Sequence, residues 1–550
     1  MAFDGPLVGW GSLAALVVGV GGSLYAVVRL SDWQPLATAR RRLLLGVPVG
    51  TVLTFLFLNL VFWVVQGAAD GQPVVVGFRS WSVFYPVGML TAAFAHNGLG
   101  HLTGNVLATL VFAPVAEYAW SHYPTERGSA SFSSVGTNPF ARVGAFLLAV
   151  LGVGLATSLF TPGALIGFSG VVFAFAGFAL VTRPLLAVAA IVGQQAVGLV
   201  YFGLQNPVLT ASTQTRVVAP SWANVAIQGH ALGLVIGVVL GLLLVRRRER
   251  SPDVRYVWFA ALVFAVSQAL YAFYLPLSTE RFVLFRGVGT GAVFLLAAVV
   301  ATAAADTDRT LLARIDLSRR EVATGLLLAV LFALALAAVP YNLADVSGEV
   351  DPEDPNTAGG VEVRDYTVAY VEGVPNQYIE AVEIPVVGGG LSVNESGVVV
   401  TSDRRNAWEV VVSRSQLAFR GRASVPVGGV GWRERVVVNR TQWSMTGGGT
   451  AYKVYLKPPG EPRKLAFGSD PATADPVING TLIRVAPVPQ PGGYRVELVE
   501  NETVAATTPV PVAGANRTLR GLTFNRTGSK LRVVEGDTVV TIATYRSGRK

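Results

Sequence analysis

Residues 229–241 read GHALGLVIGVVLG, an apolar stretch in which a glycine recurs at every fourth position. At 3.6 residues per turn, this spacing places Gly229, Gly233, Gly237 and Gly241 along one side of a helix. A stripe of small residues allows two membrane helices to approach backbone to backbone. The stretch therefore predicts a membrane helix that packs tightly against a partner with small residues of its own.

A matching face occurs on the apolar segment that carries Ser169. Gly170, Ala174 and Gly177 follow that serine at helical spacing. Ser169 and His230 each lie within about two turns of the start of their helices, or roughly 10 Å. Packing the two small-residue faces together would bring His230 to Ser169 at the same depth in the membrane.

The composition places these two segments in a membrane protein. The chain has 550 residues, of which 52% are hydrophobic and 14% are charged, against about 25% charged residues in soluble domains. It contains no cysteine, which excludes a disulfide scaffold and a cysteine nucleophile. A membrane helix needs about 20 apolar residues. Apolar runs predict an α-helical polytopic protein with ten spans: 7–28, 43–66, 91–118, 143–160, 165–182, 185–204, 223–245, 256–275, 283–304 and 322–340. The first run lacks a basic start and an A-x-A cleavage site, so we interpret it as a spanning helix and not as a signal peptide.

The distribution of arginine predicts the orientation in the cell membrane. Of the 20 basic residues before residue 341, 16 lie in alternate loops. Such loops face the cytoplasm, which places the N-terminus and the region after 341 outside. The net charge of +9 thus reflects membrane topology, and we expect the lipid bilayer and no nucleic acid as a partner.

The region 342–550 predicts an extracytoplasmic, all-β, sandwich-like fold. It contains no spanning run, and its β-branched or alternating stretches are separated by Gly-, Pro- and Asn-rich turns. All the N-x-Ser/Thr sequons lie in this region, which predicts a glycoprotein. Their asparagines are Asn394, Asn439, Asn479, Asn501, Asn516 and Asn525.

Ser169 and His230 together predict a nucleophile and its base. A neutral imidazole removes the hydroxyl proton during attack and later protonates the leaving amine. His101 and Asn105 are four residues apart, so they share one helix face and point into one cavity. With the backbone N–H of Ser169, they would stabilise the oxyanion of the tetrahedral intermediate.

Three motifs resemble those of the rhomboid intramembrane serine proteases: His96-x4-His101-x3-Asn105, GFSG at 167–170, and His230-x2-Gly233-x3-Gly237. The resemblance implies a six-helix catalytic core and a Ser–His dyad without a third acid. It assigns Ser169 as nucleophile, His230 as base, and His101 and Asn105 as oxyanion donors. It implies single-pass membrane proteins as substrates, cut where their helix unwinds near small residues, and no cofactor. The structural residues expected near the site are His96, Gly167, Gly170 and Gly233.

The resemblance covers residues from about 43 to 245 and suggests four parts. These are an extra N-terminal helix with a cytoplasmic loop (1–42), a rhomboid-like catalytic core (43–250), three additional transmembrane helices (251–341) and the extracytoplasmic β-rich region (342–550). The family often has a Trp-Arg pair in the first outer loop, whereas this chain has Arg79, Ser80 and Trp81 in the reverse order. The Arg-rich, cysteine-free composition favours a prokaryotic, and more specifically an archaeal, surface protein.

Two other functions stay open on the sequence. A catalytically inactive rhomboid-like protein would bind membrane helices without cutting them, although such relatives typically lose the serine or the histidine. A transporter fits ten spans, but no inverted repeat supports it. In a chain with 60 glycines, a lone GFSG is typical of helix packing, so the protease interpretation depends on the combination. We expect no metal site, a bracing role for Glu117, and a solvated His122 in a cytoplasmic loop.

Overall fold

The structure is a computed structural model. It describes residues 6–30, 35–124, 127–208, 226–276, 282–306, 310–312, 317–346, 359–377, 394–478, 480–489 and 493–547. Its contacts divide the chain into two units. We call Met1–Pro276 with Phe282–Ala344 the membrane unit, and Leu277–Arg281 with Asp345–Lys550 the β unit.

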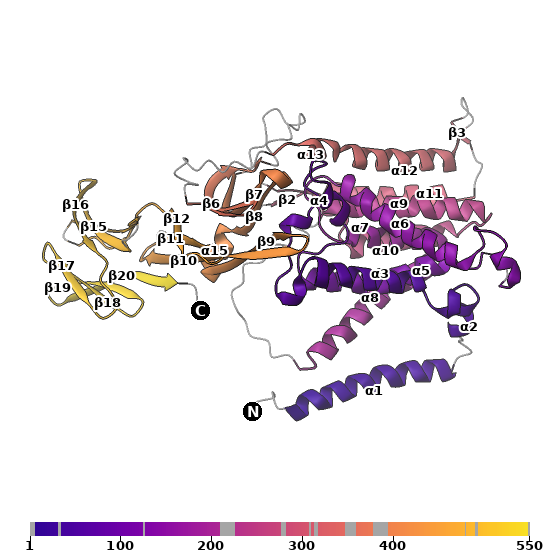
Figure 1. Ribbon diagram of the computed structural model, residues 1–550, viewed down its shortest axis with the longest axis horizontal. Coiled ribbons are helices and arrows are strands. Elements are labelled where there is room, and N and C mark those ends of the chain that lie inside the picture. Colours follow the sequence, from indigo (N-terminus) through magenta and orange to yellow (C-terminus); the bar gives the residue numbers. More distant parts are fainter. Residues whose placement is uncertain are drawn as a thin grey trace. The chain divides into compact units, whose positions relative to one another are not determined.

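The membrane unit consists of helices, with two short strand pairs (Figure 1). Its helices are α1 (Pro6–Leu30), α2 (Pro35–Arg40), α3 (Val49–Leu60, continued by a π-turn at Val61–Val65), α4 (Pro86–Thr91), α5 (Leu99–Trp120), α6 (Pro139–Leu159), α7 (Ser169–Thr182), α8 (Pro184–Gln205), α9 (Ile227–Arg247), α10 (Val254–Ser267), α11 (Arg286–Ala304), α12 (Arg319–Leu336) and α13 (Val339–Leu343). The strand pairs are β1 (Tyr274–Pro276) with β2 (Phe282–Leu284), and β3 (Thr310–Leu312) with β4 (Leu317–Ser318).

Seven of the described helices are long and apolar enough to cross a membrane. They are α1, α5, α6, α8, α9, α11, and α12 together with α13. Three shorter apolar segments, Val49–Val65, Ser169–Thr182 and Val254–Ser267, coincide with the other three predicted spans. The predicted fold class of a polytopic helical membrane protein is confirmed.

The predicted span 91–118 is wrong at its start. α4 ends at Thr91, and α5 begins only at Leu99. The side chain of Gln66 explains the break, because its Nε2 donates to the carbonyl of His96 and its Oε1 accepts from the N–H of His96, both at 2.8 Å. Both backbone groups of His96 are therefore bonded away from any helix.

The predicted span 256–275 is wrong at its end. α10 stops at Ser267, two residues before Ala269 with its φ of 53°. A left-handed residue of this kind ends a helix. The chain then enters β1, which pairs with β2.

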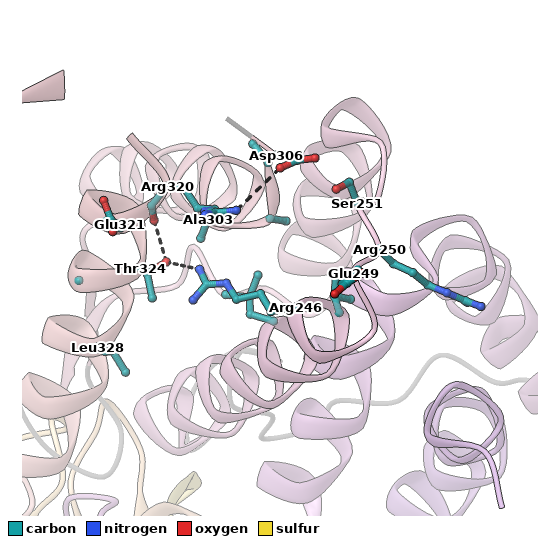
Figure 2. Close-up of a pocket in the computed structure, with 15 residues that line it drawn as sticks. Arg246, Glu249, Arg250, Ser251, Ala303, Asp306, Arg320, Glu321, Thr324 and Leu328 are labelled. Atoms are coloured by element: carbon teal, nitrogen blue, oxygen red, sulfur yellow. Dashed lines mark hydrogen bonds and ion pairs between the residues drawn. The ribbon is translucent and has the colours of Figure 1, made fainter. Parts of the chain in front are cut away.

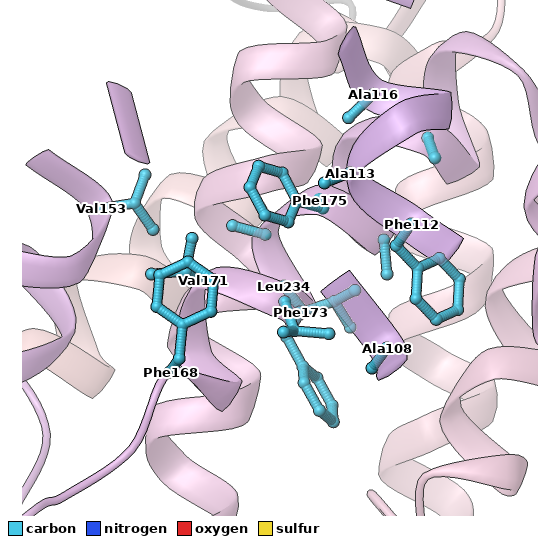
Figure 3. Packing of buried hydrophobic residues seen from close by; sticks show 14 of the residues in the cluster. Ala108, Phe112, Ala113, Ala116, Val153, Phe168, Val171, Phe173, Phe175 and Leu234 are labelled. Atoms are coloured by element: carbon cyan, nitrogen blue, oxygen red, sulfur yellow. The ribbon is translucent and has the colours of Figure 1, made fainter. Parts of the chain in front are cut away.

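α7 lies in the core of the membrane unit. Eleven of its 14 residues are buried, as expected for a helix that is apolar all round. Figure 3 shows Phe168, Val171 and Phe175 packed with Phe112 of α5 and Val153 of α6 in one buried cluster. Ser169 is thus carried on an element with protein on every side.

In its described residues, the β unit contains three antiparallel sheets and one short α-helix, α15 (Arg414–Arg420). The first sheet is β5 (Val361–Val363), β6 (Tyr366–Pro375), β7 (Asn394–Ser402) and β8 (Ala407–Ser413). The second, in spatial order, is β12 (Lys464–Gly468), β11 (Thr450–Lys457), β10 (Trp432–Met445), β20 (Thr538–Ser547), β19 (Lys530–Glu535), β18 (Leu522–Thr527) and β17 (Asn516–Leu519), with β9 (Arg422–Gly429) also on β10. The third is β13 (Ala472–Thr473), β14 (Leu482–Pro487), β15 (Tyr494–Glu500) and β16 (Thr503–Pro509). The predicted C-terminal β region is confirmed.

β10 belongs to two parts of the β unit. Its first half, from Trp432 to Asn439, pairs with β9, and its second half, from Thr441 to Met445, pairs with β20. Trp443 of this second half lies in one buried cluster with residues of β14 and β15. Sheet therefore packs on sheet there, as in a sandwich.

The sequons are distributed over the surface of the β unit. Asn394, Asn501 and Asn516 are exposed, whereas Asn439 and Asn525 are partly buried on strands. Asn479 lies outside the described residues.

Candidate active site

Ser169 is the first residue of α7, and Gly167 shapes the loop before it. Gly167 has a φ of 127°, a conformation open to glycine, and its N–H donates to the carbonyl of Ala92 at 2.9 Å. A Cβ at Gly167 would lie 2.4 Å from Cε1 of His101. Both the backbone angle and the available space therefore require glycine two residues before the serine.

The hydroxyl of Ser169 lies 2.7 Å from Nε2 of His230 on α9. The close packing of α7 and α9 sets this distance. A Cβ at Gly233 would lie 2.0 Å from the carbonyl oxygen of Gly170, and Gly237 meets a second α7 carbonyl at the same distance. The two helices therefore touch backbone to backbone through the glycine stripe, and the serine and histidine meet at one end of it.

The imidazole of His230 is held flat against a phenyl ring. Its centroid lies 4.1 Å from that of Phe173, and the two planes differ by 17°. Phe173 stands four residues after Ser169, so it lies on the same face of α7. Among the described residues, no carboxylate hydrogen-bonds this imidazole, and its ring bonds only Ser169.

His101 and Asn105 on α5 both approach the loop that precedes Ser169 and contains Gly167. His101 Nε2 and Asn105 Nδ2 would lie 2.7 and 3.6 Å from a Cβ at Gly167. Asn105 is 7% exposed, and its Nδ2 has no hydrogen-bond partner among the described residues. The side chains of His101 and Asn105 thus both lie beside the loop that precedes Ser169, and the amide of Asn105 can donate a hydrogen bond there.

His96 packs against His101. It is fully buried, and its ring centroid is 5.2 Å from that of His101, in an edge-on arrangement. Within the described part of the chain, no group of three His, Asp or Glu side chains could hold a metal ion.

Sequence reasoning missed two positioning residues, Gln66 and Phe173. The i, i+4 spacing from Ser169 is a signal that could have found Phe173. Gln66 stands at the end of an apolar run, where a lone amide carries no recognisable pattern.

Residues 83–247 match the family model described as Rhomboid domain. This part of the chain is a rhomboid domain. The matched segment contains Ser169, His230, His101 and Asn105, and the predicted membership of the rhomboid family is confirmed. A search of curated proteins and a search of solved structures give no match.

The segment before the rhomboid match is hydrogen-bonded to the loop that precedes Ser169. The N–H of Ser80 donates to the carbonyl of Leu165 at 3.1 Å, and the N–H of Leu165 donates to the Ser80 hydroxyl at 3.0 Å. Arg79 Nη1 donates to the carbonyl of Ala164 at 3.0 Å. This loop therefore holds the approach to α7 although Arg79 and Trp81 stand in the reverse of the family's usual order.

The opposite end of the rhomboid domain is tied together by Glu117. Its carboxylate accepts from the N–H groups of Gly50 and Thr51, at 2.7 and 2.8 Å, at the start of α3. The expectation that His122 is solvated is wrong, because its side chain is fully buried against this carboxylate at 2.8 Å. The N–H of Leu44 donates to Nδ1 of His122, so the proton resides on Nε2 and faces Glu117. These bonds brace two chain segments more than sixty residues apart.

Proposed function

We propose that this protein is an intramembrane serine endopeptidase that cleaves transmembrane segments of membrane proteins. The observation that carries the proposal is the 2.7 Å hydrogen bond between Ser169 Oγ and His230 Nε2. Nucleophile and base in hydrogen-bond reach are the signature of covalent catalysis. Here they lie at the starts of two apolar helices inside a rhomboid domain.

In the first half of the reaction, His230 Nε2 takes the proton of Ser169 Oγ while Oγ bonds the scissile carbonyl carbon. The imidazolium then gives this proton to the peptide nitrogen as the C–N bond breaks, which leaves an ester on Ser169. In the second half, a water gives its proton to the same Nε2 and attacks the ester. Collapse of that intermediate releases the new carboxyl group and returns the proton to Oγ.

His101 and Asn105 serve as donors to the oxyanion. Asn105 Nδ2 is buried without a partner among the described residues. The amide can therefore turn toward a developing negative charge without breaking a hydrogen bond of this nitrogen. The backbone N–H of Ser169 adds a third donor, since the first N–H groups of a helix have no intrahelical acceptor. Removal of one such donor typically reduces the rate by about 10²–10³-fold.

Phe173 takes over the orienting part that a carboxylate plays in a triad. A stacked ring at 4.1 Å restricts the imidazole to one plane, which keeps Nε2 directed at Ser169. The dyad therefore needs no third acid to hold its geometry.

The side of the domain next to α8 offers a route for a substrate helix. The buried residues of α8 are Ala187, Ala190 and Ile191, all in its first two turns. Its later part, toward the same end as Ser169, diverges from α3 and α5 in Figure 1. A single-pass membrane protein in the bilayer would reach the serine there.

The orientation we propose places this end outside the cell membrane. The arginine-rich ends of α9 and α12 lie at the opposite end from Ser169, and such ends face the cytoplasm. In this orientation the N-terminus and the β unit are extracytoplasmic. The exposed sequons at Asn394, Asn501 and Asn516 would then be glycosylated, which mass spectrometry of peptides from the native membrane protein would test.

A fluorescent fluorophosphonate tests the proposal on the full-length protein in detergent. We expect labelling of the wild type and none of Ser169→Ala or His230→Ala, with parallel loss of cleavage of a single-pass substrate in proteoliposomes. Ser267→Ala is the matched control, because Ser267 is an exposed serine at the end of α10 whose hydroxyl donates to the carbonyl of Phe264 and accepts from Gln268. Equal absence of labelling in folded wild type and Ser169→Ala would reject the protease and favour an inactive, helix-binding rhomboid-like protein.

A further inference from the structure

α10 lies outside the matched rhomboid segment, which ends at residue 247, and yet it packs into the core of the rhomboid domain. Its buried residues are Val257, Ala260, Ala261, Phe264 and Ala265. These positions share one face of the helix. Phe264 belongs to the same buried cluster as Phe173 of α7. An added helix thus contributes to the packing around the proposed catalytic residues.

Phe264 contacts the phenyl ring that lies against the proposed base. It is 1% exposed, and its ring centroid is 5.1 Å from that of Phe173, with the two planes at 73°. A second edge-on contact, at 5.7 Å and 89°, joins Phe264 to Phe112 of α5. Edge-to-face contacts are a preferred arrangement of aromatic rings. Since Phe173 also stacks on His230, rings from α10, α7 and α9 follow one another without a break.

The plane of the Phe173 ring determines the plane of the imidazole. Among the described residues, the imidazole of His230 hydrogen-bonds only Ser169, so its stacking partner restricts how the ring turns. A phenyl ring can itself turn about χ2, whose preferred range is broad. The contact with Phe264 limits this turn, because protein interiors are close-packed and a tilted Phe173 ring would meet its neighbour.

α10 is held in place near both of its ends. Near its start, Val257 lies in a second buried cluster with residues of α9, α11 and α12. Just after its end, α11 approaches so closely that a Cβ at Gly289 would lie 1.7 Å from the carbonyl oxygen of Tyr271. Phe264 therefore stands on a helix that cannot slide or rotate without disturbing its neighbours.

The added helices are also bonded to the helix that carries His230. Arg246 Nη2 of α9 donates to Thr324 Oγ1 of α12 at 2.7 Å, beside a pocket that both residues line (Figure 2). Because α12 and α10 share the second buried cluster with α9, this bond helps to keep α10 in a fixed position relative to α9.

We propose that Phe264 is a positioning residue of the Ser169–His230 dyad, supplied by a helix outside the rhomboid match. The inference rests on the proposed protease function and deepens it. Phe264 holds the ring of Phe173, and Phe173 holds the imidazole with Nε2 directed at Ser169 Oγ. Because Phe264 acts through Phe173, it contributes to the rate of the chemical step and not to the binding of substrate. The catalytic unit of this protein therefore extends to α10.

Fluorophosphonate labelling of the full-length protein in detergent tests the proposal, with the maximal labelling rate separated from the half-saturating probe concentration. We expect Phe264→Ala to reduce the maximal rate by about 10-fold and to leave the half-saturating concentration unchanged. Leu327→Ala is the matched control, since Leu327 is fully buried on α12 in the cluster that does not contain Phe173. A wild-type maximal rate in folded Phe264→Ala, or the same loss in Leu327→Ala, would overturn the proposal. Absence of labelling in the wild type would instead reject the protease function itself.

A double variant tests whether Phe264 acts through Phe173. The Phe173→Ala/Phe264→Ala variant should label no more slowly than Phe173→Ala alone, because a ring that is missing cannot be positioned. Independent effects of about 10-fold each would multiply to about 100-fold, and that result would refute the positioning role. Phe264→Leu replaces Phe264→Ala in both experiments if the alanine variant does not fold, because leucine keeps much of the apolar volume but has no ring edge.

Discussion

Gly233→Ala tests whether the glycine stripe positions the dyad. The added Cβ would lie 2.0 Å from the carbonyl oxygen of Gly170, whereas carbon and oxygen atoms without a bond approach to about 3.3 Å. Neither partner is a flexible side chain, so the backbones of α7 and α9 have to separate by about 1.3 Å. Gly233 lies one turn from His230, and the separation acts directly on the contact between His230 and Ser169.

The expected loss of activity follows from that displacement. A Ser169–His230 distance of 2.7 Å would grow to about 4 Å, at which no hydrogen bond exists. A misplacement of about 1 Å costs a reaction roughly 100-fold, and a positioned general base contributes about 10²–10⁴-fold. We therefore expect the labelling rate and the cleavage rate to fall by about 100-fold or more, although only one methyl group is added.

The assay compares the rate of fluorophosphonate labelling with the thermal unfolding midpoint in the same detergent. Gly152→Ala is the neutral control, since a Cβ there meets nothing within 4 Å, and Gly241→Ala is intermediate, with its contact at 3.2 Å to Phe178. The order of the rates should be Gly152→Ala, Gly241→Ala, Gly233→Ala. Wild-type labelling by folded Gly233→Ala would refute the reasoning, as would equal loss of rate in Gly233→Ala and Gly241→Ala.

Three further predictions concern single side chains. Asn105→Ala should reduce kcat for cleavage by about 10²–10³-fold without changing the unfolding midpoint, and an unchanged kcat would exclude Asn105 as an oxyanion donor. Phe173→Ala should reduce kcat by about 10-fold, because the imidazole loses the ring that orients it, whereas Phe173→Tyr should restore most of the rate; equal rates in both variants would argue against orientation by stacking. Glu117→Gln should lower the free energy of unfolding by about 3 kcal/mol, because an amide NH₂ would then face N–H or O–H donors at the start of α3. The thermal unfolding midpoint measures this loss, and an unchanged midpoint would mean that these hydrogen bonds do not stabilise the fold.

The meeting of α7 and α9 was predictable because its signal is local. Four glycines at a fixed spacing mark one face of α9, and Gly170, Ala174 and Gly177 form a complementary small-residue face on α7. Small-residue packing depends on backbone shape alone, so it can be read without knowledge of the rest of the fold. The position of Ser169 at a helix start also follows from the Pro-Gly sequence before it.

Two of the errors came from contacts with distant residues. His122 stands in a polar stretch beside a proline, and its burial depends on Leu44, 78 residues away. The late start of α5 depends on an amide of Gln66, 30 residues from His96. No local pattern encodes either contact, because one polar side chain can satisfy any backbone group that the fold brings within reach.

The long strand β10 has a mechanical consequence for the β unit. Its 14 residues span roughly 46 Å at about 3.3 Å per residue, and its two halves carry different neighbours. Bending or twisting between those neighbours would require the rupture of ladder bonds along one continuous strand. The strand therefore couples the two ends mechanically, so a force applied at the β20 end is transmitted to the β9 end. A ligand or glycan bound near the β20 end of β10 is thus held at a fixed distance from the β9 end.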